Sequence, residues 1–302
     1  MAGNGAIAAV PSPPIFLAAL AAGLFSAVIW GATPAATAFA VLGMEPLTAG
    51  LLRTVLAMPI VLIIAIMAKL PLPGTRREWA LLLISSLCGF LGFTLIFTIG
   101  IAQTSTSHAG LILAGVPLLT GLAGALAARA MPSRLWFAGA AIAITGEVIL
   151  ITSRGGAVGE ATLSGDLLCV MSTLCAAIGY VAGSRVSERI GTWATTAWGI
   201  TLAATIQIPI LWFTTTEMNW AAVPAAAWGG VAYLVVMSAV VAYAAWYWSL
   251  STGGVVRVSP VQYAQPLVSL ILAVVLFSEP MTMPLIVAAV LILGGIALAR
   301  RG

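Results

Sequence analysis

Two glutamines and a proline stand at the start of a strongly apolar run near the end of the chain. Gln262, Gln265 and Pro266 precede "VSLILAVVLF", a stretch that is typical of a lipid-facing helix. A proline inside a helix removes a backbone hydrogen bond, and the carbonyl left unpaired needs protein or water nearby. Gln262 and Pro266 share one helical face, and Gln265 adjoins it. We expect this face to line a cavity, with the amides binding substrate and Pro266 acting as a hinge.

Ionisable residues inside apolar runs are the next candidates, because a charge within hydrocarbon is costly and marks a functional site. Arg53 and Glu147 are expected at a similar depth, where they form a structural ion pair, a gate or a substrate contact. His108 and Arg257 begin two other runs, and a cation at a helix N-terminus suits a substrate carboxylate. The alternatives are a hydrogen-bonded interfacial residue for His108 and a cytoplasmic anchor for Arg257.

Aromatic residues gather in a further apolar run at Tyr243, Trp246 and Tyr247. Their spacing of three and four residues places them on one helical face. Such a face lines a transport path, or it belongs to the belt of Trp and Tyr at a membrane interface. Trp30 and Tyr180 are further candidates for the path.

The elements that position these residues are membrane-spanning helices. Of the 302 residues, 62% are hydrophobic and 7% are charged, whereas soluble proteins carry roughly 25% charged residues. Apolar runs of close to the roughly 20 residues that a bilayer requires occur repeatedly. Glycines in these runs, including Gly139 and Gly146, are expected to allow close helix packing. The sequence predicts an all-α polytopic membrane protein with ten spans, at residues 15–31, 48–68, 79–99, 107–128, 134–151, 164–184, 192–213, 225–249, 257–277 and 282–299.

The orientation follows from Lys and Arg, which are retained in cytoplasmic loops. With a cytoplasmic N-terminus, the inner loops and tail hold ten of these residues, and the outer loops hold Arg154 alone. We therefore expect residues 1–14 and 300–302 on the cytoplasmic side of a bacterial inner membrane, and residues 152–163 as an outer loop. No basic cluster with interleaved aromatics is present, so nucleic acid is not an expected partner. The three cysteines lie in apolar runs and predict neither a disulfide nor a metal site.

An internal repeat organises the spans. A shift of 149 residues aligns the third, fourth and fifth spans with the eighth, ninth and tenth without a gap. It pairs Trp79 with Trp228, Pro117 with Pro266, and Gly146 with Gly295. Because each half has an odd number of spans, the second half is inverted. We predict two inverted five-helix repeats, residues 15–151 and 164–299, around a central cavity with Pro117 and Pro266 as hinges. The alternative is chance similarity between apolar runs.

The repeat, its prolines and the stretch "LFSEPMTMPLIVAAVLILGGIAL" resemble the EamA-type members of the drug/metabolite transporter superfamily, over nearly the whole chain. The stretch "VAYAAWYW" is most similar to bacterial aromatic amino acid exporters. The family often has an acidic residue after the proline helix in both halves. Glu279 supplies it in the second half, whereas Ala130 stands at the matching position in the first. The resemblance implies a small-metabolite exporter of the inner membrane.

These observations predict a secondary transporter that exports amino acids, aromatic and other apolar ones included, by alternating access within the lipid bilayer. Sugar phosphates are disfavoured because a single cation, Arg53, is clearly embedded. The alternatives are an exporter of other amphipathic metabolites or drugs, a channel, and a membrane-embedded enzyme. An enzyme would need a nucleophile with a base, or paired aspartates, and neither pattern is present. No catalytic residue, cofactor or metal is predicted, and no oligomer is required.

Overall fold

The computed structural model describes residues 13–129, 131–153, 161–216, 218–253, 261–262, 264–299 and 301. Within these residues every regular element is a helix. Seven helical segments are long and apolar enough to cross a membrane, and three shorter apolar helices lie at Thr106–Thr120, Ala264–Phe277 and Met283–Ala299. Together they account for the ten predicted spans, and the predicted all-α polytopic membrane fold is confirmed.

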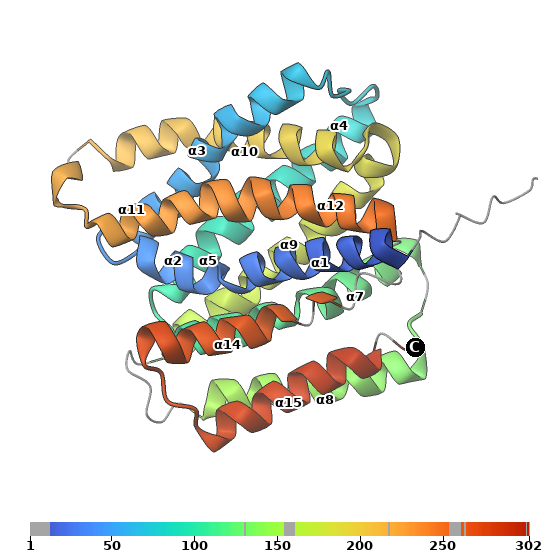
Figure 1. Ribbon diagram of the computed structural model, residues 1–302, viewed down its shortest axis with the longest axis vertical. Coiled ribbons are helices and arrows are strands. Elements are labelled where there is room, and N and C mark those ends of the chain that lie inside the picture. The colour runs from blue at the N-terminus through green and yellow to red at the C-terminus, as the bar shows by residue number, and fades with distance from the viewer. Residues whose placement is uncertain are drawn as a thin grey trace, which may run out of the picture.

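The helices run between two opposite faces of the molecule (Figure 1). The first half comprises α1 (Pro13–Gly31), α2 (Thr33–Ala40), α3 (Pro46–Met67), α4 (Arg76–Ser85), the π-helix η1 (Ser86–Gly92), α5 (Phe93–Ile101), α6 (Thr106–Ala114), α7 (Val116–Ala128) and α8 (Arg134–Thr152). The second half comprises α9 (Leu163–Ile190), α10 (Thr192–Thr214), the 3-10 helix η2 (Trp220–Ala222), α11 (Ala225–Ala232), the π-helix η3 (Tyr233–Val241), α12 (Ala242–Gly253), α14 (Ala264–Phe277) and α15 (Met283–Ala299). We call the face where α1 begins and α15 ends the terminal face, and the opposite one the distal face.

Local sequence signals set where several helices begin. The side chains of Thr75, Ser105, Ser133 and Thr162 each accept a backbone N–H in the first turn of the helix that follows. Such caps satisfy N–H groups that have no partner within the helix. They lie where the chain turns back at either face, so polar residues of the short loops fix the ends of apolar helices.

Two helical segments extend more than one helical turn beyond the ends of their predicted spans. The first continues through α2 to Ala40, and the sixth reaches Ile190. The added part of the first segment is rich in Ala and Thr, so its hydropathy does not identify it. It is held by packing instead, because a Cβ on Gly230 of α11 would lie 2.5 Å from the carbonyl oxygen of Ala36.

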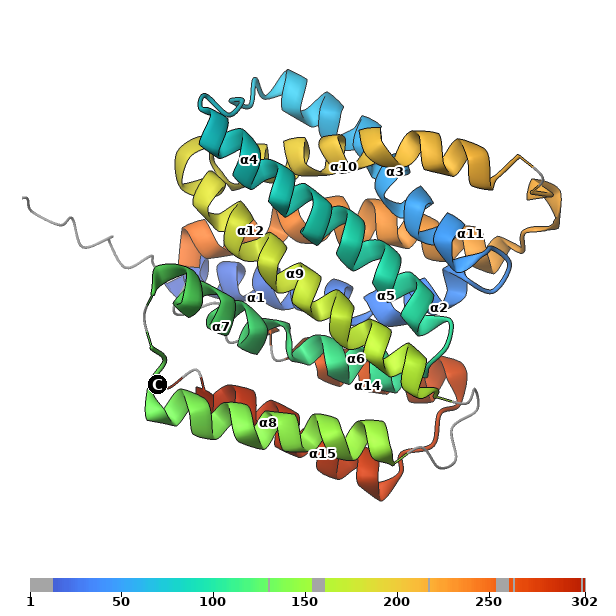
Figure 2. The ribbon, with the colours of Figure 1, turned by 180° about the vertical axis from the view of Figure 1, so that it is seen from behind.

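The two halves contact each other through matching helices. α3 lies along α10, α8 along α15, and α6 against α14, while α1 packs on α12 as α4 and α5 pack on α9 (Figures 1 and 2). The two π-helices also correspond, because the shift of 149 residues moves η1 onto residues 235–241, inside η3. These contacts pair helices at equivalent places in the two halves, and the inversion of the second half stays a prediction.

Glycines allow the closest of these contacts. A Cβ on Gly139 of α8 would lie 2.4 Å from the backbone nitrogen of Ala299 in α15, and one on Gly146 would lie 2.9 Å from the carbonyl oxygen of Ala288. Only a residue without a side chain permits helices to approach at such distances. The expectation that Gly139 and Gly146 allow close packing is confirmed.

The two repeat-related prolines lie at helix starts. Pro117 is in the first turn of α7, which follows an interruption at Gly115, and α14 begins at Ala264, two residues before Pro266. The N–H groups of a first turn have no acceptor in the helix, so proline costs no hydrogen bond there. Pro117 follows the interruption at Gly115, and Pro266 stands in the first turn of α14 as described, so the structure differs from the expected unpaired carbonyl inside a continuous helix. The hinge role of both prolines stays a prediction.

Candidate functional site

A cavity of about 550 Å³ lies between the two halves. Residues from α1, α2, α3, α5, α6, α7, α9, η3, α12, α14 and α15 line it. Its lining includes Ile296, one turn from the end of α15, so the cavity extends from the middle of the molecule toward the terminal face. Eight of the candidate residues from the sequence line this cavity: Trp30, Arg53, Tyr180, Tyr243, Trp246, Gln262, Gln265 and Pro266.

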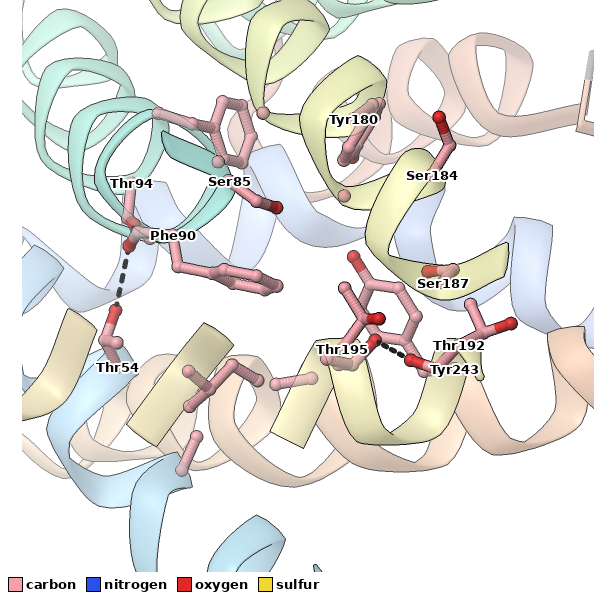
Figure 3. Close-up of a pocket in the computed structure, with 18 of the residues that line it drawn as sticks. Thr54, Ser85, Phe90, Thr94, Tyr180, Ser184, Ser187, Thr192, Thr195 and Tyr243 are labelled. Carbon is pink, nitrogen blue, oxygen red and sulfur yellow. Dashed lines mark hydrogen bonds between the residues drawn. The ribbon is translucent and has the colours of Figure 1, made fainter. Parts of the chain in front are cut away.

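A second cavity of about 260 Å³ lies between α3, α9, α10 and the α4–α5 segment (Figure 3). Its wall is rich in hydroxyl groups, which come from Thr54, Ser85, Thr94, Ser184, Ser187, Thr192, Thr195 and Thr196. Ser187 and Thr192 flank the turn between α9 and α10, so this cavity also reaches toward the terminal face. Figure 3 shows the Phe90 ring extending across the cavity toward Tyr243.

Four residues line both cavities: Arg53, Phe93, Tyr180 and Tyr243. We call this group the junction. The guanidinium carbon of Arg53 lies 5.9 Å from the centroid of the Phe93 ring, within the range of a cation–π interaction. Tyr180 and Tyr243 complete the group around this guanidinium. The Nη1 atom of Arg53 is nevertheless buried and has no hydrogen-bond partner.

Arg53 dominates the electrostatics of both cavities. Among the described residues that line them, it is the only Arg, Lys or His, and none is Asp or Glu. An Arg guanidinium presents N–H groups that match a carboxylate in a two-point contact. The arrangement therefore suits a ligand that carries a negative group.

An aromatic wall stands beside the junction. The Trp30 ring meets the rings of Tyr243 and Trp246 edge-on, with centroids 5.0 and 5.8 Å apart. The indole N–H of Trp30 donates to the carbonyl oxygen of Ser238 at 3.1 Å, which fixes this ring across the contact between the halves. Trp248 is 48% exposed, because it follows Trp246 by two residues and so lies on a different face of α12. The side chain of Tyr247 lies outside the described part of the chain.

The predicted amides enter the same cavity. Gln262 and Gln265 line it and are partly buried, and Pro266 next to them is buried. The sequence analysis missed Ser269, one turn further along α14, whose buried hydroxyl has no hydrogen-bond partner. Serine is common in membrane helices, so the residue type alone did not identify Ser269 as a lining residue, and only its position in the structure does. Arg257 lies outside the described residues.

His108 occupies a buried network near the distal face. Its Nδ1 atom lies 3.1 Å from the carboxylate of Asp166, which is fully buried. Glu279, from the turn before α15, accepts the backbone N–H groups of Thr106 and Ser107 at 2.7 and 3.1 Å. His108 is not among the described lining residues of either cavity, so the structure places it away from the junction. Asp166 was missed because it lies near the start of a predicted span, where a charge is unremarkable. Glu279 was named in the sequence only for the resemblance to the family, and its contact with α6 was not predicted.

Arg53 and Glu147 do not form the ion pair that their depth allows. No ion pair joins the two residues in the described structure. The Nη1 atom of Arg53 and the Oε2 atom of Glu147 are both buried and have no hydrogen-bond partner. Glu147 faces the interruption between α6 and α7, where its Oε1 lies 3.4 Å from the position of a Cβ on Gly115. Arg53 and Glu147 were expected at a similar depth in the membrane, but their side chains do not face each other.

Because they are apart, Arg53→Gln and Glu147→Gln are expected to change the stability independently. A double-mutant cycle should give a coupling energy within about 0.5 kcal/mol of zero. Thermal unfolding in detergent measures it, with the cycle for His108 and Asp166 as a control that should show clear coupling. A coupling above about 1 kcal/mol between Arg53 and Glu147 would show that they do pair.

Glu279 is expected to hold the distal face closed, because its carboxylate from the second half caps a helix of the first. Glu279→Ala removes charged hydrogen bonds, which are worth about 1.5–3 kcal/mol each, and should raise the thiol reactivity of the buried Cys169 by roughly tenfold or more. The measurement uses a Cys88→Ser, Cys175→Ser background. Glu78→Ala, which removes an exposed cap on α4, is the control. Unchanged reactivity of Cys169 would contradict this role.

Comparisons with known proteins agree with this geometry. The model of the EamA-like transporter family matches residues 17–152 and 163–301. Two uncharacterized transporters of Bacillus subtilis (strain 168) are similar: YdeK, 25% identical over 92% of this chain and 96% of its own, and YyaM, 24% identical over 90% of each. A crystal structure of another protein, 21% identical, covers 93% of this chain and 98% of its own with a TM-score of 0.62.

The relatives carry no assigned substrate, so the similarity to aromatic amino acid exporters stays a prediction. The family match covers nearly all of both halves, and the structure supplies the multi-pass helical fold with a central cavity. The chain therefore belongs to the EamA-like transporter family and is a multi-pass membrane transporter for a small-molecule substrate.

Proposed function

We propose that this transporter exports amino acids, aromatic and other apolar ones included, across the bacterial inner membrane. The observation that carries the proposal is the junction, where the single charged side chain among the described lining residues of the two cavities stands next to an aromatic wall. A positive group beside an apolar surface suits a molecule with a carboxylate at one end and an apolar body at the other.

The substrate carboxylate is assigned to Arg53. Its Nη1 atom is buried without a partner, and a buried polar group is expected to find one. A charge-assisted hydrogen bond from a guanidinium to a carboxylate is about twice as strong as a neutral one. Sugar phosphates carry more charge than one guanidinium can neutralise, and cationic drugs would meet no carboxylate among the described lining residues.

The body of the substrate is assigned to the aromatic wall of Trp30, Tyr243 and Trp246. A cavity of about 550 Å³ falls within the range of roughly 300–1,000 Å³ that is common for small-molecule sites. The α-ammonium of an amino acid can lie over an aromatic face or contact the amide oxygen of Gln265. These contacts support amino acids as the substrates, and the cavity leaves room for amino acid side chains of different sizes.

Alternating access is supported by how the two halves meet. Both halves line the cavity, which extends toward the terminal face, while Glu279 joins the halves at the distal face. The Lys and Arg asymmetry of the sequence favours a cytoplasmic terminal face. In that orientation the site is open to cytoplasmic substrate, as export requires.

The test is counterflow in proteoliposomes with a panel of labelled phenylalanine, leucine, a nucleoside, a quaternary amine and a sugar phosphate. Saturable counterflow of phenylalanine and leucine alone is the expected result. Saturable movement of another class instead would overturn the amino acid assignment, and flux that never saturates would favour a channel. Arg134→Gln, which removes an exposed arginine at the start of α8, is the control variant.

A further inference from the structure

We infer that this transporter moves its substrates chiefly by exchange, one carboxylate going out as another comes in, because the empty carrier holds a cation without a counterion. The inference rests on the proposed function, since it needs a carboxylate at Arg53. It adds a mode of transport, which neither the fold nor the family match specifies.

The starting observation is the isolation of Arg53. No Asp or Glu is among the described residues that line either cavity, and no described ion pair includes Arg53. Glu147, the other embedded charge outside the distal network, packs behind the α6–α7 interruption. The Phe93 ring lies 5.9 Å from the guanidinium, and Tyr180 and Tyr243 share both cavity linings with Arg53.

In the conformation that the structure describes, the two cavities reduce the energetic cost of leaving the Arg53 charge without a counterion. Arg53 belongs to the lining of both the larger cavity and the hydroxyl-rich one. Both extend toward the terminal face, so water from that side can reach the polar surfaces around Arg53, whose Nη1 atom is itself buried. Tyr180, which lines both cavities, is 45% exposed although it belongs to the middle of α9.

Alternating access removes that water. Between the two open states the site must be closed to both sides of the membrane, and the cavities around Arg53 must shrink. Desolvating an ion without a partner costs more than a cation–π contact returns. A carboxylate bound to Arg53 neutralises the cation and travels with it, so the loaded carrier changes state more easily than the empty one.

The kinetic consequence is that the return of the empty carrier limits net transport. Exchange avoids this step, because the site is occupied in both directions. Each tenfold difference in rate corresponds to about 1.4 kcal/mol. We expect exchange to exceed net efflux by tenfold or more.

The experiment uses proteoliposomes of the full chain loaded with labelled phenylalanine, in sulfate buffer so that chloride does not serve as a counterion. Efflux is measured into buffer alone, into buffer with unlabelled 3-phenylpropionate, and into buffer with 3-phenylpropionamide. The last two probes differ only in the carboxylate. The expected result is a rise of tenfold or more with 3-phenylpropionate and none with the amide.

Arg53→Gln should abolish this stimulation, and Arg134→Gln should retain it. Equal efflux into buffer alone and into 3-phenylpropionate would overturn exchange while leaving the proposed function intact. Equal stimulation by acid and amide would also overturn it, because the effect would then not depend on the charge. If phenylalanine moves under no condition, the proposed function and the inference both fail.

Discussion

Arg53→Gln is expected to weaken the binding of phenylalanine by about 10- to 100-fold. The substitution keeps a polar side chain but removes the positive charge and most of the N–H groups of the guanidinium. Hydrogen bonds to charged groups contribute about 1.5–3 kcal/mol, and each 1.4 kcal/mol corresponds to about a factor of ten in Kd. Titration calorimetry of the purified protein in detergent measures the change.

The same variant should bind more weakly but be at least as stable as the natural protein. Arg53 is a buried cation with an unpartnered nitrogen, and such a charge costs folding free energy. Arg53→Gln should therefore melt at the same temperature as the natural protein or higher, while Arg134→Gln leaves both binding and melting unchanged. Weaker binding together with a lower Tm would point to misfolding, and unchanged binding would remove Arg53 from the site.

Gly295→Leu is expected to separate α8 from α15 and to have the largest effect on stability. A Cβ on Gly295 would lie 2.5 Å from the backbone nitrogen of Ala143 and 2.5 Å from the carbonyl oxygen of Gly139. Backbone atoms of a packed helix cannot move aside as a flexible side chain does. Overpacking of this kind costs about 3 kcal/mol or more, which corresponds to a decrease in Tm on the order of 10 °C.

The neighbouring residue provides the matched control. A Cβ on Gly294 would meet no atom within 4 Å, and both positions lie in α15. Leucine is favoured over glycine in a helix by roughly 0.5–1 kcal/mol, so Gly294→Leu should keep or raise the Tm. Thermal unfolding and size-exclusion profiles of the two variants check the pair. Equal behaviour would show that the contact between α8 and α15 does not limit stability.

The fold was largely predictable because hydrocarbon imposes a simple requirement on the sequence. A helix that crosses a bilayer needs about 20 apolar residues, and each predicted span corresponds to a helical segment or, for the ninth, to its described part. The exceptions have a physical reason. The extension of the first segment to Ala40 consists of small residues held by packing against α11, which hydropathy does not record.

The site was predictable where a residue type conflicted with its surroundings. Arg53, Gln262 and Gln265 are polar groups in apolar runs, and all three line the central cavity. The hydroxyl groups of the second cavity gave no such signal. Serine and threonine can satisfy themselves on the helix backbone, as Thr196 does on the carbonyl oxygen of Thr192, so they occur in any membrane helix.

The pairing of Arg53 with Glu147 failed for a different reason. The sequence gives the depth of a residue along its helix, but the direction in which it faces depends on how the helices are rotated. The same limit hid the contact between His108 and Asp166, which come from two helices. Contacts between helices therefore required the structure.

The two π-helices set one such rotation. Phe93 directly follows η1, and Tyr243 stands two residues after η3, so each half delivers an aromatic ring to the junction just past a widened turn. The wide turn also leaves the Phe90 carbonyl to accept hydrogen bonds from Thr54 of α3 and Gln207 of α10. A π-turn holds one residue more than an α-turn. Deleting a single residue from η1 would turn Phe93 by about 100° away from Arg53, so the length of this segment, and not only its composition, determines which side chains form the junction.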